Sequence, residues 1–207
     1  MRKKIDIHKP AIVVDMRDKE QGESVSSQEP ATVVVFGVPR GGTTMMAGVV
    51  ARCGVDIGSD LPVNLEDQAF VSRSNEQMIE TIRERNASKS LWGWKFPRAA
   101  LYLPAIHQEI RNPHYIMVWR DALSSRLRPI SNGREVALAL ENAHKMQKQN
   151  IDILKTVPGK YLLVSYEKSI LDPQGLAEQV ASFIGVDVPR HMEELIEFMR
   201  PGTYKSQ

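Results

Sequence analysis

The chain has 207 residues, which is enough for one domain of ordinary size with a well-formed hydrophobic core. Hydrophobic residues make up 42% and charged residues 25%, a balance typical of a soluble globular protein and not of a disordered chain or a membrane protein. The formal net charge of +2 is too small to indicate a nucleic-acid-binding face, so we expect any attraction to an anionic ligand to be local.

The single cysteine, Cys53, excludes an internal disulfide and a cysteine metal site, and we expect no metal. It falls on the apolar side of an expected helix, which favours a buried structural thiol over a reactive one. The N-terminal residues MRKKIDIHKP carry charge but no apolar core behind it, which argues against a secretory signal. Because no stretch reaches the roughly 18 apolar residues of a transmembrane helix, we expect a cytoplasmic protein that does not bind a membrane. The sequence gives no indication of the oligomeric state.

Residues 1–30 are predicted to be a partly mobile N-terminal extension, followed by a single α/β domain over residues 31–207. Within the extension, AIVVDM fits either a short strand or an apolar segment lying on the domain. The polar residues 17–31, rich in Ser, Glu and Gln, predict a mobile loop or linker that leads into the first core strand.

The segment VVVFGVPRGGTT, residues 33–44, combines a buried strand, a glycine-rich loop and a helix start. Its continuous apolar run suits a parallel strand that is covered on both faces. Glycines at positions 37, 41 and 42 let the backbone approach a ligand closely. A helix beginning near Gly42 would direct its unpaired N–H groups and the positive end of its dipole at that ligand, which favours phosphate or sulfate.

The rest of the chain alternates between strand and helix patterns. Strands are expected over residues 91–95, 115–119 and 161–165, helices over 74–86, 99–110, 135–156, 176–184 and 191–199, and an irregular crossing over 56–72. This alternation predicts a three-layer α/β/α domain with a mostly parallel sheet, similar to P-loop NTPases. Arg40, Lys95 and Arg120 each follow a strand, so we expect these cations to converge beyond the carboxyl ends of the strands, where such sheets bind ligands.

The spacing from Gly37 to Gly42 matches the first six positions of the nucleotide-binding P-loop, but Thr43 stands where that motif has lysine. A kinase or NTPase uses the lysine on the transferred phosphates, so the substitution weakens a nucleoside-triphosphate interpretation. The nearest cation is Arg40, inside the loop.

GVPRGGTT resembles the PRSGTT-type 5′-phosphosulfate loop of sulfotransferases that use 3′-phosphoadenosine-5′-phosphosulfate (PAPS), with Gly41 in place of the usual Ser. The resemblance implies a loop that binds the cofactor through Pro39, Arg40, Gly41, Gly42, Thr43 and Thr44. Arg40 would stabilise charge on the leaving phosphate. A guanidinium does not give up its proton readily, so this role is electrostatic and not general acid catalysis.

Two later segments extend the resemblance. WGWKFPR is similar to the WG-K-DPR segment of bacterial sulfotransferases, with Phe96 in the acidic position, and implies a catalytic Lys95 near the reacting sulfate. IMVWRDALSSRLR is similar to the strand and helix that bind the 3′-phosphate through an Arg and a Ser eight positions later. Arg120 matches the Arg, but the eighth residue is Arg128, so either Ser124 or Ser125 takes the Ser role or Arg128 binds the phosphate itself.

The His that cytosolic members use as a base shortly after the second strand is missing here, and His107 and His114 fit structural roles better. The carboxylates of NLED correspond to an acidic segment of bacterial and carbohydrate relatives, which makes Glu66 the first candidate base and Asp67 the second. Such a base would need a pKa raised by partial burial. With a further likeness over YLLVSYEKSILDPQGLAEQVASFIGV, the matches span residues 33–188.

The leading hypothesis is a PAPS-dependent sulfotransferase of bacterial type that sulfates a hydroxyl or amine of a small molecule or carbohydrate and releases 3′,5′-adenosine bisphosphate. One alternative is a small-molecule kinase or another P-loop NTPase. A second is a non-catalytic nucleotide-binding protein of the same fold. We expect residues 56–72 and 128–134 to wall the acceptor pocket, and neither segment identifies the acceptor.

Overall fold

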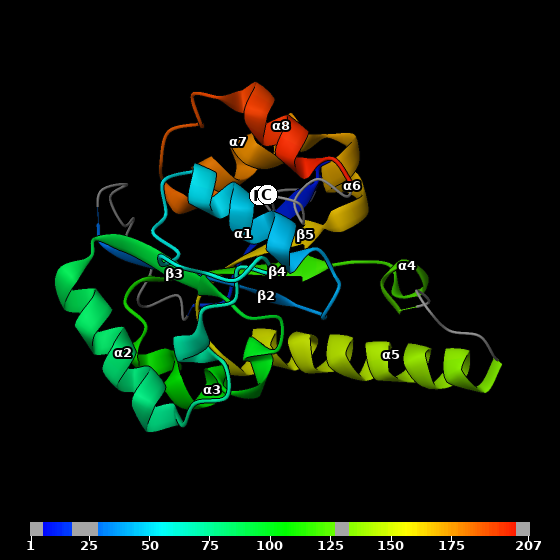
Figure 1. The fold of residues 1–207 in the computed structure, drawn as a ribbon, viewed down its shortest axis with the longest axis horizontal. Coiled ribbons are helices and arrows are strands. Elements are labelled where there is room, and N and C mark those ends of the chain that lie inside the picture. Colours follow the sequence, from blue (N-terminus) through cyan, green and yellow to red (C-terminus); the bar gives the residue numbers. More distant parts are fainter. Residues whose placement is uncertain (1–5, 18–28, 127–132, 202–207) are drawn as a thin grey trace.

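The computed structural model describes residues 6–17, 29–126 and 133–201. They form a five-stranded sheet in the order β1-β5-β4-β2-β3, with helices on both faces (Figure 1). β1 runs antiparallel to β5, and the other neighbouring strands are parallel. The predicted three-layer α/β/α class with a mostly parallel sheet is confirmed.

The strands are β1 (Ala11–Asp15), β2 (Ala31–Gly37), β3 (Leu91–Lys95), β4 (Pro113–Trp119) and β5 (Lys160–Ser165). Every residue of β2 is buried, as expected for an apolar strand between two parallel neighbours. Of the two interpretations of AIVVDM, the strand is found, because β1 pairs with β5 along its whole length. The division of the chain at residue 31 stays a prediction, and residues 18–28 lie outside the described part.

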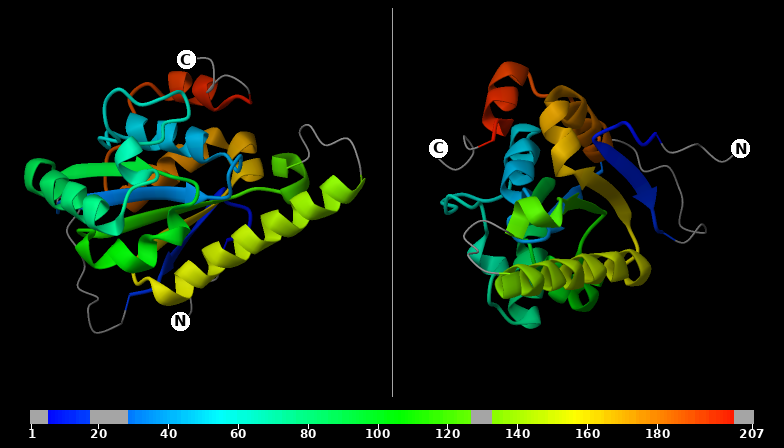
Figure 2. Two further views of the ribbon diagram at one scale, coloured as in Figure 1. Left: turned by 60° about the horizontal axis from the view of Figure 1, so that its bottom comes forward. Right: turned by 90° about the vertical axis from the view of Figure 1, so that its right-hand side faces the viewer.

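One face of the sheet is covered by α1 (Thr43–Arg52), α6 (Tyr166–Leu171), α7 (Pro173–Ile184) and α8 (Met192–Met199). The other face carries α2 (Asn75–Ser88), α3 (Leu103–Ile106) and α5 (Gly133–Thr156), as Figure 2 shows from two further directions. The short α4 (Ala122–Arg126) follows β4, and α5 extends from the sheet past the carboxyl ends of the strands (Figure 1).

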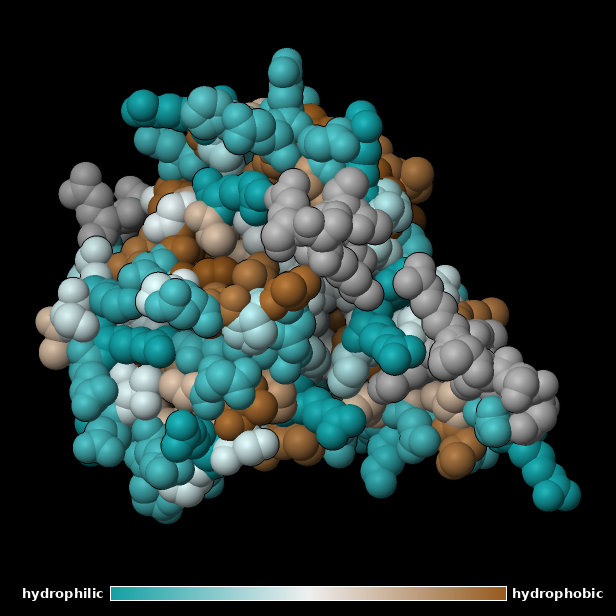
Figure 3. All heavy atoms as spheres, viewed as in Figure 1, coloured by the Kyte–Doolittle hydropathy of each residue, from teal (hydrophilic) through white to brown (hydrophobic). Residues whose placement is uncertain are grey.

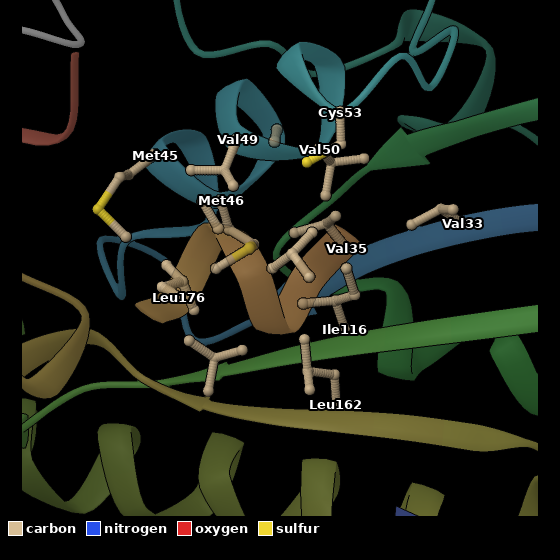
Figure 4. Packing of buried hydrophobic residues seen from close by; sticks show 14 of the residues in the cluster. Val33, Val35, Met45, Met46, Val49, Val50, Cys53, Ile116, Leu162 and Leu176 are labelled. Atoms are coloured by element: carbon tan, nitrogen blue, oxygen red, sulfur yellow. The ribbon is translucent and has the colours of Figure 1, made fainter. Parts of the chain in front are cut away.

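Alternate residues of the strands feed two separate cores. Val33 and Val35 of β2 point toward α1 and α7, where Figure 4 shows Val35 packed with Met46 and Val50. On the opposite face, Phe70 stacks on Trp94 of β3 with ring centroids 4.1 Å apart and planes 8° from parallel. Both cores are built from side chains with almost no exposed surface, so burial of apolar area fixes the register of the sheet.

The continuous helix predicted over residues 99–110 was wrong. The segment forms three short turns, η3 (Ala99–Leu101), α3 (Leu103–Ile106) and η4 (His107–Glu109). Pro104 explains the break, because proline has no N–H to donate and its ring clashes with the carbonyl four residues earlier in a helix interior. Among the described elements, α6 and the short turn η2 (Gln68–Phe70) were not predicted, and α4 lies where the resemblance implied a helix after β4.

Candidate functional site

The loop between β2 and α1 ends in a helix N-terminus that no side chain caps. Gly42 is the N-cap residue with φ 94°, a left-handed conformation that favours glycine. No side chain accepts a hydrogen bond there, and the first turn of α1 contains no acidic residue. The N–H groups of this turn are therefore suited to an external anion.

The glycines of the loop are required by close packing. A Cβ on Gly41 would lie 2.5 Å from the carbonyl oxygen of Val38, to which the Gly41 N–H donates at 2.8 Å. A Cβ on Gly42 would lie 2.2 Å from the ring of Tyr166. Gly41, which stands where the PRSGTT-type loop of sulfotransferases has Ser, therefore belongs to a turn too tight for a side chain.

Arg40 lies at the exposed outer edge of this turn with φ 64°, which is uncommon for a residue other than glycine. Its carbonyl oxygen accepts a hydrogen bond of 3.0 Å from Nη1 of Arg120. The backbone of the loop is thereby tied to the residue that follows β4.

Arg120 lies beside the loop because β4 is the neighbour of β2, with Gly37 paired to Val118. The chain leaves β2 toward β3 on one side and leaves β4 toward β5 on the other, so the two strands flank the switch point of the sheet. The Arg120 guanidinium lies 4.1 Å from the centre of the Tyr166 ring. Its Nε is buried and has no hydrogen-bond partner in the described part of the chain, which leaves one donor for a ligand.

Lys95 is only 2% exposed and forms an ion pair with Glu66, with 2.9 Å between Nζ and Oε1. Nζ also donates to the carbonyl oxygen of Asn64 at 2.9 Å, and the Thr44 hydroxyl donates to the same oxygen at 3.2 Å. Burial lowers the pKa of Lys95, and the Glu66 carboxylate opposes this shift. The structure thus brings Lys95, Glu66 and the first turn of α1 together, with the lysine already paired.

Asp67 has different partners from its neighbour Glu66. It pairs with Arg85 at 2.5 Å, and its Oδ1 accepts a hydrogen bond of 2.9 Å from the N–H of Ala69. Arg85 in turn lies 5.4 Å from the ring centres of Phe70 and Trp92. These contacts hold Asp67 against the aromatic core of the sheet, and Glu66 is the carboxylate that reaches Lys95.

The candidate serines after β4 use their hydroxyls within α4. Ser124 donates to Oδ2 of Asp121 through its N–H at 2.8 Å and its Oγ at 2.9 Å. Ser125, 3% exposed, donates from Oγ to the carbonyl oxygen of Ala122 at 3.1 Å. A role of either hydroxyl in phosphate binding would replace one of these bonds. Arg128 lies outside the described residues.

Sequence reasoning missed a cavity of about 430 Å³ between the segment after β3 and helix α5. Its lining includes Gly37, Arg98, Asn142, Lys145, Gln149 and Asn150. The recurrence of polar residues along one face of α5 could have indicated it, but only the tertiary fold brings that face next to Arg98. In Figure 3, hydrophilic side chains cover most of the visible face, and hydrophobic ones gather in smaller patches.

The other titratable residues that the sequence singled out are held by contacts within their own segments or by the core. His107 contacts the carbonyl oxygen of Pro104, and the buried His114 contacts that of Asn112, each through Nδ1 at 3.0 Å. Cys53 is buried in the core beneath α1, and burial raises its pKa to about 11. The described residues contain no cluster of three or more metal-ligating side chains. None of the helices in those residues is both long and apolar enough to cross a membrane.

Comparisons with known proteins identify no family for this chain. No family model matches it, and no curated protein matches it. Among solved structures, it is similar to retinol dehydratase in a complex with retinol and PAP, with a TM-score of 0.49 and 13% sequence identity. The match covers 84% of this chain and 66% of that protein, so the chain spans slightly less than two thirds of its length.

Proposed function

We propose that the protein is a PAPS-dependent sulfotransferase that transfers a sulfuryl group to a hydroxyl or amine of a small-molecule or carbohydrate acceptor. The observation that carries this proposal is the loop from β2 to α1. It combines an uncapped helix N-terminus with an exposed Arg40, and Thr43 replaces the lysine that nucleoside triphosphates require. The bacterial sulfotransferase motifs around Lys95 and Arg120 support the same interpretation.

The donors at the site fit a ligand with phosphate at both ends. The N–H groups of the first turn of α1 and the hydroxyls of Thr43 and Thr44 suit the 5′-phosphosulfate. The unpartnered Nε of Arg120 suits the 3′-phosphate, because a charge-assisted bond would satisfy a buried donor. PAPS supplies an activated sulfuryl group, whose bond to the 5′-phosphate breaks as the acceptor oxygen or nitrogen bonds to sulfur.

The chain's own residues would position the reactants and neutralise charge, as in phosphoryl transfer. The Arg40 guanidinium would stabilise the negative charge that collects on the departing 5′-phosphate. Glu66 would take the proton of the acceptor, and Lys95, 2.9 Å from it, would hold that carboxylate in place. The first turn of α1 lies near this pair, because Thr44 and Lys95 share the Asn64 carbonyl oxygen.

The P-loop kinase alternative has less support. The parallel strands end in Gly37, Lys95, Trp119 and Ser165, so none of them ends in the aspartate that would hold magnesium beside the phosphates. Asp121, two residues beyond the end of β4, accepts the hydrogen bonds that cap α4.

A non-catalytic nucleotide-binding protein is favoured by one specific observation. The hydroxyls of Ser124 and Ser125 and the ammonium of Lys95 already have partners within the chain. A protein that only holds the nucleotide would need Arg120 and the loop, but not a base.

Calorimetry separates the three functions. We expect 3′,5′-adenosine bisphosphate to bind without metal, and ATP with magnesium to bind much more weakly. PAPS should then be turned over with an acceptor from a panel of hydroxyl and amine compounds. Binding of ATP alone would reject the proposal, whereas bisphosphate binding without turnover across the panel would favour the non-catalytic protein.

A further inference from the structure

The cavity between the segment after β3 and α5 has the size and position of a small-molecule site. Its volume of about 430 Å³ lies within the range of ligand pockets. Gly37, from which the phosphate loop departs, forms part of its wall. The Gly37 N–H also donates to the carbonyl oxygen of Pro97 at 3.2 Å, which joins the loop to the other wall. A ligand in the cavity would therefore lie next to the phosphate loop.

The cavity has a pronounced chemical character. Arg98 and Lys145 contribute two cations, and no carboxylate lies among its lining residues. Asn142, Gln149 and Asn150 contribute three carboxamides, and the rest of the lining is apolar or glycine. Positions 142, 145 and 149 are spaced three and four apart on α5, so they share one face of the helix.

These polar groups have no partners within the described protein. None of the side chains of Arg98, Asn142, Lys145, Gln149 or Asn150 makes a hydrogen bond or ion pair with another residue of the described ranges. Asn150 is only 3% exposed, but its carboxamide is not among the fully buried atoms that lack a partner, so it keeps some access to the space of the cavity. By contrast, Lys148 on the same helix bonds both carboxylate oxygens of Asp152 at 2.8 Å. The donors and acceptors of the cavity are thus available to a ligand.

We propose that this cavity binds the sulfuryl acceptor, and that the acceptor is a small polyhydroxylated molecule carrying a carboxylate or phosphate. Two unpaired cations in a lining that contains no carboxylate favour an anionic group, and three carboxamides suit hydroxyls as both donors and acceptors. The assignment of the ligand as the sulfuryl acceptor rests on the proposed function. The chemical class of the ligand follows from the lining of the cavity alone.

The test measures binding of matched probes by ligand-observed NMR and calorimetry, without PAPS. The probes are glucuronate and glucose 6-phosphate, which separate the carboxylate from the phosphate source, with glucose as the neutral member of the set. We expect at least one anionic probe to bind roughly fivefold or more tightly than glucose, because Arg98 and Lys145 are exposed and water screens their attraction for an anion. Arg98→Ala and Lys145→Ala should each reduce the affinity for the anionic probe by about the same factor. Asn150→Asp should weaken it too, because it adds a negative charge.

Lys148→Ala is the matched control, since it removes a cation from the same helix outside the cavity and should leave probe binding unchanged. Equal binding of glucose and both anionic probes, or no effect of Arg98→Ala and Lys145→Ala in folded protein, would overturn the inference. Displacement of the anionic probe by 3′,5′-adenosine bisphosphate would also overturn it, because the cavity would then belong to the nucleotide.

The inference and the proposed function fail in different ways. If the anionic probe binds and the bisphosphate does not, the proposed sulfotransferase is wrong while the anion-binding cavity stands. If the bisphosphate binds and no anionic probe does, the proposed function stands and this inference is wrong.

Discussion

The Nη1 of Arg120 donates a hydrogen bond of 3.0 Å to the backbone carbonyl oxygen of Arg40. The two arginines are 80 positions apart in the chain, and the adjacency of β2 and β4 brings them together. The bond uses the backbone of Arg40 and leaves its guanidinium exposed. The two residues are therefore suited to different tasks: Arg40 lies at the outer edge of the loop, and Arg120 lies beside it.

Replacing Arg40 with alanine should reduce turnover much more than cofactor affinity. The exposed guanidinium would act on charge that develops only as the phosphate leaves, so we expect kcat to fall about 10²-fold. The affinity for 3′,5′-adenosine bisphosphate should change by only a few fold. Calorimetry and steady-state kinetics on the same preparation measure both quantities.

Arg40→Gly is the control for folding in this experiment. At φ 64° glycine avoids a cost of about 1 kcal/mol, so this variant should be at least as stable to heat as Arg40→Ala. Loss of turnover in both variants would then come from the missing guanidinium. A large loss of bisphosphate affinity in either one would contradict the role assigned to Arg40.

Replacing Arg120 with alanine should have the opposite pattern. The change removes the bond to the Arg40 carbonyl, the contact with Tyr166 and the unpartnered Nε donor. We expect bisphosphate affinity to fall about tenfold or more, with kcat at saturating PAPS reduced less, because charged hydrogen bonds contribute roughly 1.5–3 kcal/mol. Arg120→Lys should restore only part of the affinity, since an ammonium lacks the planar fork of donors. Equal losses of affinity in Arg40→Ala and Arg120→Ala would show that the two roles are not separate.

Much of the fold was predictable because its strands are short apolar runs between breaking residues. The strand expected at residues 91–95 is β3 to the residue, and the all-apolar run before Gly37 is the fully buried β2. The helix predicted over 99–110 was wrong because the apolar residues of this segment recur at helical spacing, whereas Pro104 prevents one continuous helix. The local pattern of apolar residues thus predicted the strands of the sheet. It failed where one proline interrupts an apolar pattern of helical spacing.

The site was predictable in part, for a related reason. Motifs indicate which residues follow each strand, so Arg40, Lys95 and Arg120 were found as candidates. They do not indicate partners that come from distant segments. The pairing of Lys95 with Glu66 joins residues 29 positions apart, and the cavity of α5 depends on how that helix lies against the segment after β3.

Introducing at position 41 the serine of the PRSGTT-type sulfotransferase loop should damage the protein and not improve it. A Cβ there would lie 2.5 Å from the Val38 carbonyl oxygen. This oxygen belongs to the backbone, so it can move away only if the whole turn changes its conformation. We expect Gly41→Ser to lower the free energy of unfolding by about 1–3 kcal/mol, the range for overpacking, and to weaken bisphosphate binding. Urea denaturation and calorimetry measure the two effects.

Gly54→Ala is the matched control, because Gly54 has φ 86° but its Cβ would meet nothing within 4 Å. It should cost about 1 kcal/mol of unfolding free energy from backbone strain and leave bisphosphate affinity unchanged. A Gly41→Ser variant with full stability and tighter binding would mean that the loop adopts another conformation in solution.

The Lys95–Glu66 pair should be strongly coupled in stability. Glu66→Ala leaves a buried ammonium without its carboxylate, for which we expect a loss of about 3 kcal/mol in unfolding free energy. Lys95→Met alone should cost less, because Glu66 keeps access to solvent. The double variant should cost clearly less than the sum of the two, as a double-mutant cycle by urea denaturation measures. Additive costs would exclude an energetic link between the two residues.

The conservative variant Glu66→Gln separates stability from catalysis. Glutamine still accepts the hydrogen bond from Lys95, so the loss of stability should be smaller than for Glu66→Ala, but it cannot take a proton. We expect kcat to fall about 10²-fold or more, while bisphosphate affinity is retained. Unchanged turnover would remove Glu66 as the base.

His114 should make the protein less stable in mild acid. Burial lowers the pKa of this histidine below its ordinary value of 6.5; the contact with the Asn112 carbonyl oxygen opposes this shift, and the nearby charges of Lys160 and Arg17 add to it. Between the ordinary pKa and the lowered one, the unfolded chain binds the proton and the folded chain does not, so the free energy of unfolding falls as pH drops through this window. Urea denaturation at several pH values from about 7 to 5 should show this loss, and His114→Gln should reduce the slope. His144→Gln, on an exposed part of α5, should keep the wild-type slope; if His114→Gln keeps it as well, other groups cause the acid sensitivity.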